Sequence, residues 1–202
     1  MILQRCPWPG TDPLYLAYHD HEWGRPVYDR NRLFEKICLE GQQAGLSWIT
    51  VLRKREHYRA AFHHFDPDAI ARMDSADIDQ LLHNPGLIRH RGKLDAIVKN
   101  ARALLTMEAQ GEDFVAFLWQ YATAPGSHGP RRHITDIPAH TPESQALSKA
   151  LKKRGFSFVG TTTCYAFMQS MGLVNDHLDH CFCQAPCDEA PRKNWTNISD
   201  AL

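Results

Sequence analysis

The sequence predicts an all-α protein built as a helical bundle. Over most of the chain, apolar residues recur every three or four positions, as Leu33, Phe34 and Ile37 do, which is the spacing of one helix face. Ser, Thr, Asp or Asn precedes most of these segments, often followed by Pro, as is typical of helix starts. Strand signals are nearly absent, and residues 156–159 form the only short β-like run.

The capping residues give the expected helices in order. They are predicted to start at Asp12-Pro13, Asp29 or Asn31, Ser47, Asp66-Pro67, Asp74, just after Gly92, near Phe114, Thr141-Pro142, Thr161, and Asn175 or Asp176. The helix capped by Ser47 is expected to continue to Phe65. Residues 122–140 are polar and rich in Gly, Pro and His, which predicts a long loop. Residues 1–183 are expected to form one domain, and residues 184–202, which lose the apolar period, a mobile tail.

Composition and charge place the chain among ordinary globular proteins. It has 202 residues, 43% hydrophobic and 23% charged. Lys plus Arg equals Asp plus Glu at 23 each, so net charge alone does not favour nucleic acid. No apolar run approaches the roughly 20 residues that span a bilayer, and the N-terminus lacks a secretory signal. We expect a cytoplasmic protein without membrane contact, in which the six cysteines are metal ligands or free thiols.

One carboxylate stands out in the stretch from Leu39 to Thr50. Glu40 lies among apolar neighbours, at the end of one predicted helix and before a pair of glycines. A lone acid at such a site either forms a structural ion pair or takes part in chemistry, because both arrangements perturb carboxylates. The local pattern leaves both interpretations open.

The run from Cys38 to Glu56 closely resembles the DNA-3-methyladenine glycosylase I family. The likeness covers about residues 4–183 and includes the further blocks 18–20, 22–24, 86–93, 147–156 and 172–177. The resemblance implies an all-α helix-hairpin-helix glycosylase fold that removes 3-methyladenine from alkylated double-stranded DNA. It also implies release of the free base, and we expect a monomer.

A helix-hairpin-helix is predicted over residues 75–105. Gly86 and Gly92 would let the backbone turn and expose N–H groups at a helix N-terminus, where phosphate is attracted. The alternative is an ordinary helical turn. Basic side chains that could assist phosphate binding are Arg89, Arg91 and Lys93. The catalytic Asp common downstream of such hairpins is missing and no lysine stands out as a nucleophile, which favours hydrolysis without strand cleavage.

A flipped base needs aromatic walls and a polar group at its Watson–Crick edge. Candidate walls are Trp8, Tyr15, Tyr18, Trp23 and Trp48, with Glu40 as the polar group and catalytic residue. Alkylation at N3 makes adenine cationic, so rings gain cation–π attraction and the glycosidic bond is already weak. The alternative for each ring is a place in the core.

Gly45 and Leu46 lie between the helix that holds Glu40 and the helix that starts at Ser47. An apolar wedge at this point could enter the base stack and stabilise an opened duplex. The alternative is a helix–helix elbow with Leu46 in the core.

The resemblance implies one structural Zn²⁺ held by Cys6, His19, His177 and Cys181. His177 and Cys181 are four residues apart and are expected on one helical face. Four protein ligands leave no open position, so the metal would clamp segments 4–22 and 172–183 together. Without the resemblance other residues compete for the metal, namely His21, His180, Cys183 and Cys187.

The sequence therefore predicts a zinc-containing DNA repair glycosylase that hydrolyses the bond between sugar and N3-alkylated adenine. One alternative is a non-catalytic zinc-containing module that binds DNA lesions. Another is a zinc hydrolase, whose metal would keep a position open for water.

Overall fold

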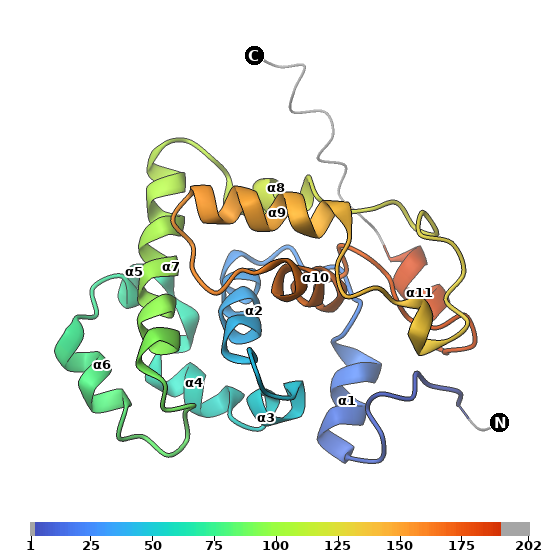
Figure 1. Ribbon diagram of the computed structural model, residues 1–202, viewed down its shortest axis with the longest axis horizontal. Coiled ribbons are helices and arrows are strands. Elements are labelled where there is room, and N and C mark those ends of the chain that lie inside the picture. The colour runs from blue at the N-terminus through green and yellow to red at the C-terminus, as the bar shows by residue number, and fades with distance from the viewer. Residues whose placement is uncertain (1–2, 191–202) are drawn as a thin grey trace.

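The computed structural model describes residues 3–190, and those residues form an all-α bundle without a strand (Figure 1). The predicted all-α class is confirmed. The elements are α1 (Pro13–His21), α2 (Arg30–Gln42), α3 (Trp48–Leu52), α4 (Arg55–Ala61), η1 (His63–Phe65), α5 (Pro67–Ile70), α6 (Ser75–Leu81), α7 (Arg91–Ala109), α8 (Phe114–Trp119), η2 (Ile134–Asp136), α9 (Pro142–Lys153), α10 (Thr161–Ser170) and α11 (Gln184–Glu189).

Helix α2 is the centre of the bundle. It packs against α7 on one side and α10 on another, and α9 covers α10 (Figure 1). The side chains of Leu33, Phe34 and Ile37 on α2 are completely buried. Asp29 caps α2 by accepting a hydrogen bond from the backbone N–H of Arg32, so Asp29 is the cap of the two that the sequence allowed.

Most helices begin at the residues that the sequence indicates. Asp12, Asp66 and Asp74 accept hydrogen bonds from the first backbone N–H groups of α1, α5 and α6. Thr141 forms a capping box with Ser144 at the start of α9. None of the described helices has the length and apolar character needed to cross a bilayer.

The prediction of a single helix from Ser47 to Phe65 is wrong. The segment is divided into α3, α4 and η1, and the residues of η1 have left-handed φ angles of 49° to 56°. This breaks the helix but turns the Phe65 ring into the core, where it is fully buried. Ser47 also caps differently from the expectation, because its hydroxyl pairs with the Thr50 hydroxyl.

The C-terminal expectations also need correction. No helix starts at Asn175 or Asp176, and residues 175–178 are irregular. The tail expected from residue 184 is wrong at its beginning, because α11 forms there and its Cys187 is fully buried. Residues 191–202 lie outside the described part of the chain.

The N-terminal segment and α11 lie on the same side of the molecule, at the right of Figure 1. The backbone N–H of Phe182 donates to the carbonyl of Gln4, 3.0 Å away. Cys6 and Cys181 belong to one small hydrophobic cluster on this side. The segments that the sequence expects to be clamped together are therefore in contact.

Candidate functional site

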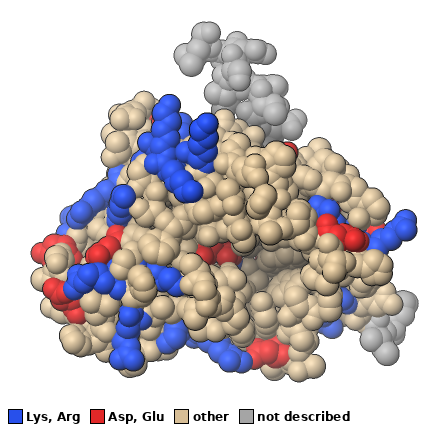
Figure 2. Space-filling model, viewed as in Figure 1, with Lys and Arg blue, Asp and Glu red and all other residues tan. Residues whose placement is uncertain are grey.

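A cavity of about 270 Å³ lies where α1, the end of α2, α3 and α10 meet the loop between α8 and α9. Figure 2 shows a hollow near the centre of one face, with acidic atoms beside it. The residues that line the cavity are Trp8, Tyr15, Tyr18, Trp23, Glu40, Gln43, Trp48, Ile134, Ile137, Ala166 and Gln169. The structure thus brings Glu40 and all five predicted aromatic residues to one cavity.

Glu40 is a buried acid in the wall of this cavity, with 4% of its surface exposed. Burial raises the pKa of its carboxyl, and the nearby Lys36 ammonium opposes that rise. The Oε1 atom lies 2.9 Å from the Nζ atom of Lys36. Glu40 therefore forms the buried ion pair of the first interpretation and also lines the cavity, while its part in chemistry stays a prediction.

Lys36 is a residue that the sequence analysis missed. Its side chain is 6% exposed, and its Nζ atom donates to the Tyr18 hydroxyl at 2.6 Å. The ammonium also lies 3.3 Å from the ring centroid of Trp48. A signal was present in the sequence, since Lys36 stands four residues before Glu40 on a face that otherwise carries apolar side chains.

The aromatic residues form a connected wall. The ring centroids of Trp8 and Tyr15 are 4.9 Å apart, those of Trp8 and Trp23 5.2 Å, and those of Tyr18 and Trp48 5.5 Å. Tyr18, Trp23 and Trp48 are also members of the main hydrophobic core, so a core role and a cavity role coincide. The buried Nε1 atom of Trp48 has no hydrogen-bond partner in the described structure.

Part of the wall comes from the loop that the sequence marks only as polar. Ile134 and Ile137 extend from this loop into the lining, and Ile134 is 46% exposed. The loop is held by Arg131, whose Nε atom donates to Asp176 at 3.0 Å. Gln43 and Gln169 add amide groups to the lining. Isolated apolar residues in a polar loop gave no periodic signal, so sequence reasoning could not select them.

The turn between α2 and α3 presents the predicted wedge at the surface. Gly45 has φ of +77°, a conformation that favours glycine, and Leu46 is 42% exposed. The alternative in which Leu46 belongs to the core is wrong. An exposed leucine on a tight turn remains available to contact another molecule.

The segment for which the sequence predicts a hairpin contains α6, most of α7 and the turn between them. Gly86 is required by packing rather than by φ, because an added Cβ would lie 2.6 Å from the His57 ring. Arg89, Arg91 and Gly92 are exposed at the start of α7. Their backbone N–H groups have no hydrogen-bond acceptor among the described residues, as phosphate binding at a helix N-terminus requires.

Lys93 differs from the expectation. Its side chain is buried, and its Nζ atom donates to the carbonyls of Gln42 at 2.8 Å and Ala44 at 2.6 Å. The ammonium therefore satisfies the C-terminal end of α2 and is not on the surface for a phosphate. This bond holds the start of α7 next to the turn that carries Leu46.

The face shown in Figure 2 carries Lys and Arg side chains in more than one place. In Figure 2, Lys and Arg atoms at the left lie among acidic atoms, and a separate basic group lies at the top near α9. Arg53 pairs with Asp12 at 2.5 Å, and Arg55 pairs with Glu22 at the same distance. These pairs reduce the positive charge that Arg53 and Arg55 offer to DNA.

Cys6, His19, His177 and Cys181 converge on one point, with their candidate ligand atoms all within 4.8 Å of one another. The measured sulfur–nitrogen separations are 3.5 to 3.6 Å. Tetrahedral Zn²⁺ with ordinary Zn–S and Zn–N bonds would place such atoms about 3.6 Å apart. The donor set and its spacing therefore fit zinc, although His177 and Cys181 come from an irregular segment and not from the expected helical face.

The outer nitrogen of each imidazole is also satisfied. Nδ1 of His19 lies 2.8 Å from the Asp20 carboxylate, and Nε2 of His177 lies 3.2 Å from the carbonyl of Trp23. Such partners orient metal-binding imidazoles and fix which nitrogen faces the ion. Of the competing residues, His21 and His180 are exposed, and Cys183 lies in a second group with His19 and Asp20.

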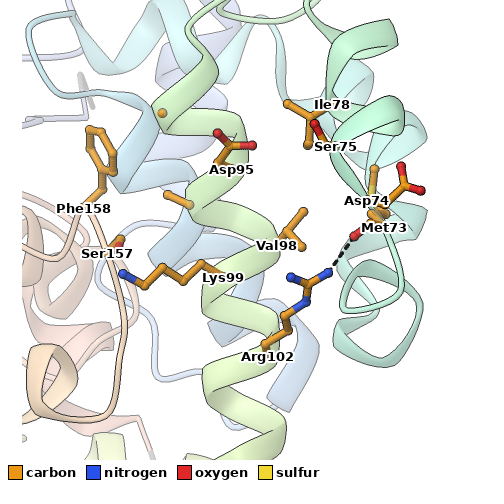
Figure 3. Close-up of a pocket in the computed structure, with 12 residues that line it drawn as sticks. Met73, Asp74, Ser75, Ile78, Asp95, Val98, Lys99, Arg102, Ser157 and Phe158 are labelled. Carbon is orange, nitrogen blue, oxygen red and sulfur yellow. Dashed lines mark hydrogen bonds between the residues drawn. The ribbon is translucent and has the colours of Figure 1, made fainter.

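A second cavity, of about 500 Å³, lies between α6, α7 and the Ser157-Phe158 segment (Figure 3). Arg102 donates to the carbonyl of Met73 at its edge, and the oppositely charged Asp95 and Lys99 are both exposed. It has neither a buried acid nor facing aromatic rings. Its larger volume therefore does not make it the better site for a planar cationic base.

Comparisons with known proteins agree on one family. The model of the methyladenine glycosylase family matches residues 8–184. A DNA-3-methyladenine glycosylase of Haemophilus influenzae is 61% identical over 89% of this chain and 97% of its own length. DNA-3-methyladenine glycosylase 1 of Escherichia coli is 58% identical over 90% of this chain and 97% of its own.

One of the similar solved structures contains a bound base. A variant of 3-methyladenine DNA glycosylase I, solved in complex with 3-methyladenine, has a TM-score of 0.84 and 38% identity. The match covers 94% of this chain and 99% of that chain. The likeness extends along nearly the whole length of both molecules.

Proposed function

The chain belongs to the methyladenine glycosylase family, and we propose that it hydrolyses the N-glycosidic bond of N3-alkylated adenine in double-stranded DNA without cleaving the strand. As a DNA-3-methyladenine glycosylase it is a hydrolase that acts in DNA repair. The observation that carries the finer proposal is Glu40, a buried acid in a cavity walled by aromatic rings. The proposal includes action as a monomer.

Recognition would depend on the positive charge of the flipped base. The Tyr18 and Trp48 rings attract a cation by roughly 0.5 to 2 kcal/mol. The Oε1 atom of Glu40 is bonded to Lys36, while its Oε2 atom has no hydrogen-bond donor among the described residues. We assign Oε2 as the acceptor for the exocyclic amine, because donors left unpaired in a dry cavity are costly.

Bond cleavage then needs little acid catalysis. The C1′–N9 bond breaks, and its electron pair neutralises the cationic base, which leaves as free 3-methyladenine. The oxocarbenium-like sugar takes up water and loses a proton, giving an abasic site. The Glu40 carboxylate would stabilise the positive sugar. Among the described residues no lysine lines the cavity, which supports simple hydrolysis without a Schiff base.

The hairpin and the Leu46 turn are the proposed DNA-binding parts. The free N–H groups at the start of α7 would hold phosphate, with Gly86, Arg89, Arg91 and Gly92 in this part of the chain. Gly45 and Leu46 would enter the stack where the base leaves it. Tyr58 supports this arrangement, because its hydroxyl binds both Gln42 of α2 and the N–H of Ile88 in the hairpin.

The proposed metal is one structural Zn²⁺ on Cys6, His19, His177 and Cys181. With four protein ligands it would supply rigidity and no open position for water. The cluster contacts the cavity wall, since the ring of His19 lies 5.1 Å from Trp8 and that of His177 lies 4.6 Å from Trp23. The zinc would therefore support the position of two wall residues.

The test is chromatography of the bases freed from methylated DNA. The wild type is expected to release 3-methyladenine, and Glu40→Gln to lose most release yet keep binding to abasic DNA. Glu56→Gln, which changes an exposed acid, is the matched control. A non-catalytic lesion-binding module would free no base, and wild-type turnover in Glu40→Gln would contradict the assignment.

A further inference from the structure

Lys36 is buried behind the wall of the base cavity, and its contacts are residues of that wall. Its side chain is 6% exposed and does not line the cavity. Its Nζ atom contacts Glu40, the Tyr18 hydroxyl and the Trp48 ring. All three of these residues line the cavity. A buried ammonium with this set of contacts can set the state of the groups that meet the base.

The direction of each hydrogen bond follows from the ammonium. A lysine ammonium has three protons and no lone pair, so it only donates. The Tyr18 oxygen therefore accepts from Lys36 at 2.6 Å, and the phenolic proton has no acceptor among the described residues. The Oε1 atom of Glu40 likewise accepts at 2.9 Å, which leaves Oε2 for a ligand.

We propose that Lys36 is the positioning residue of the base cavity: it holds Glu40 ionised, with one carboxylate oxygen free to accept from the base, and it fixes the Tyr18 hydroxyl as a donor. This inference rests on the proposed function of Glu40. It assigns a role to a residue that does not touch the base and acts through two groups that do.

The electrostatics of the pair supports this role. Burial raises the pKa of Glu40, and the Lys36 ammonium is the named group that lowers it again. Burial also lowers the pKa of Lys36 to about 8, against the attraction of Glu40. The other charged groups that face Lys36 are Arg55 of α4 and Glu22 after α1, which form an ion pair with each other. Without Lys36, Glu40 would be a buried acid with no partner.

A neutral Glu40 would reverse the chemistry of the cavity. Its protonated carboxyl would offer a donor where the amine of the base needs an acceptor. It would also lose its attraction for the cationic base and for the positive sugar. Removal of the Lys36 charge is therefore expected to act on base release through protonation, in addition to any effect on packing.

The test is the pH profile of single-turnover base release from DNA carrying 3-methyladenine, after subtraction of the spontaneous rate. The acid limb of the profile is the pH range in which base release falls as the pH is lowered. In Lys36→Met, which is similar in shape but uncharged, this limb is expected to move to higher pH by at least about one unit. At a fixed pH on the acid limb, base release by the variant should be roughly tenfold or more below the wild-type rate and should recover as the pH rises. Lys36→Arg, which keeps the charge, should keep the limb near its wild-type position. Lys99→Met, at an exposed lysine of the second cavity (Figure 3), is the matched control.

An acid limb at the same pH in Lys36→Met and wild type would overturn the proposal. If Lys36→Met does not fold, the double variant Lys36→Met/Glu40→Gln replaces it in the test. A double variant that folds where the single variant does not would show that Lys36 compensates the Glu40 charge. Failure of both to fold would overturn the proposal. Wild-type turnover in Glu40→Gln would contradict the proposed function, whereas an inactive Glu40→Gln with an unmoved limb in Lys36→Met contradicts this inference alone.

Discussion

Two buried polar sites share helix α1, and their polar groups are paired in different ways. Tyr18 belongs to the base cavity, and the next residue, His19, belongs to the cysteine–histidine cluster. In the cluster, the four candidate ligand atoms face one another and each imidazole is also held from outside. In the cavity, Lys36 holds only one oxygen of Glu40, and Trp48 Nε1 has no partner in the described structure.

The difference separates a closed site from an open one. A cluster with every donor directed inward is suited to a metal that stays bound and stabilises the fold. A cavity that keeps polar atoms unpaired is less stable for it, but a ligand that pairs with those atoms can bind there. Trp23 connects the sites, because its carbonyl holds His177 while its ring lines the cavity.

The largest expected effect is loss of the metal. Cys6→Ser should reduce bound zinc from one ion per chain to none and lower the free energy of unfolding by on the order of 5 kcal/mol. Metal analysis and thermal unfolding measure this, with Cys164→Ser, at a buried thiol outside the cluster, as the control. Stoichiometric zinc that persists in Cys6→Ser would show that the ligand set is different.

Trp23→Ala should affect both sites at once. Trp23 is 9% exposed, and its removal is expected to cost about 3 to 5 kcal/mol of stability and to weaken binding of free 3-methyladenine. Calorimetric unfolding and titration with the free base measure the two effects. Normal affinity in a destabilised Trp23→Ala would mean that the wall is not coupled to the cluster in the way the contacts indicate.

The pH dependence of base release by the wild type should distinguish the base cavity from the cysteine–histidine cluster. Burial raises the pKa of Glu40 above the 4.5 of an ordinary glutamate carboxyl. As the pH falls, Glu40 therefore takes up its proton, and stops acting as an acceptor, at a higher pH than an ordinary carboxyl would. Below that limb base release should fall about tenfold per pH unit. Rate measurements across the acid range give the limb, and a limb at or below 4.5 would contradict a buried catalytic carboxylate.

The smallest effect is expected from the surface turn, which should leave both buried sites unchanged. Leu46→Ala should reduce the affinity for DNA with a flipped base by about fivefold, or about 1 kcal/mol. Fluorescence of a base analogue in the duplex reports flipping. Binding of free 3-methyladenine and zinc content are the internal controls. Unchanged flipping in Leu46→Ala would exclude the wedge.

Much of this organisation could be predicted from the sequence. The helical period and the capping residues predicted most helix starts, and Asp12, Asp66 and Asp74 cap as expected. The resemblance pointed to Glu40, the five rings and the four Cys and His residues, which the structure places in two groups. The capping signals are local, because each depends on residues close in the chain, whereas the residues grouped by the resemblance are far apart in the chain.

The remainder depends on approaches between distant segments. The burial of Lys93 follows from the position of α2 against α7, and no local pattern distinguishes it from the exposed Arg91. The contribution of Ile134 and Ile137 depends on Arg131 reaching Asp176, 45 residues along the chain. The break after α4 depends on left-handed residues His63 to Phe65, which carry no glycine to mark it.

The most direct test of the central claim is a crystal structure of this protein with 3-methyladenine. We expect the purine in the cavity against the Trp48 ring, with its exocyclic amine within hydrogen-bond distance of Glu40 Oε2 and with Lys36 still on Oε1. A purine bound away from Glu40, or one that displaces Lys36 from the carboxylate, would refute the role proposed for Glu40.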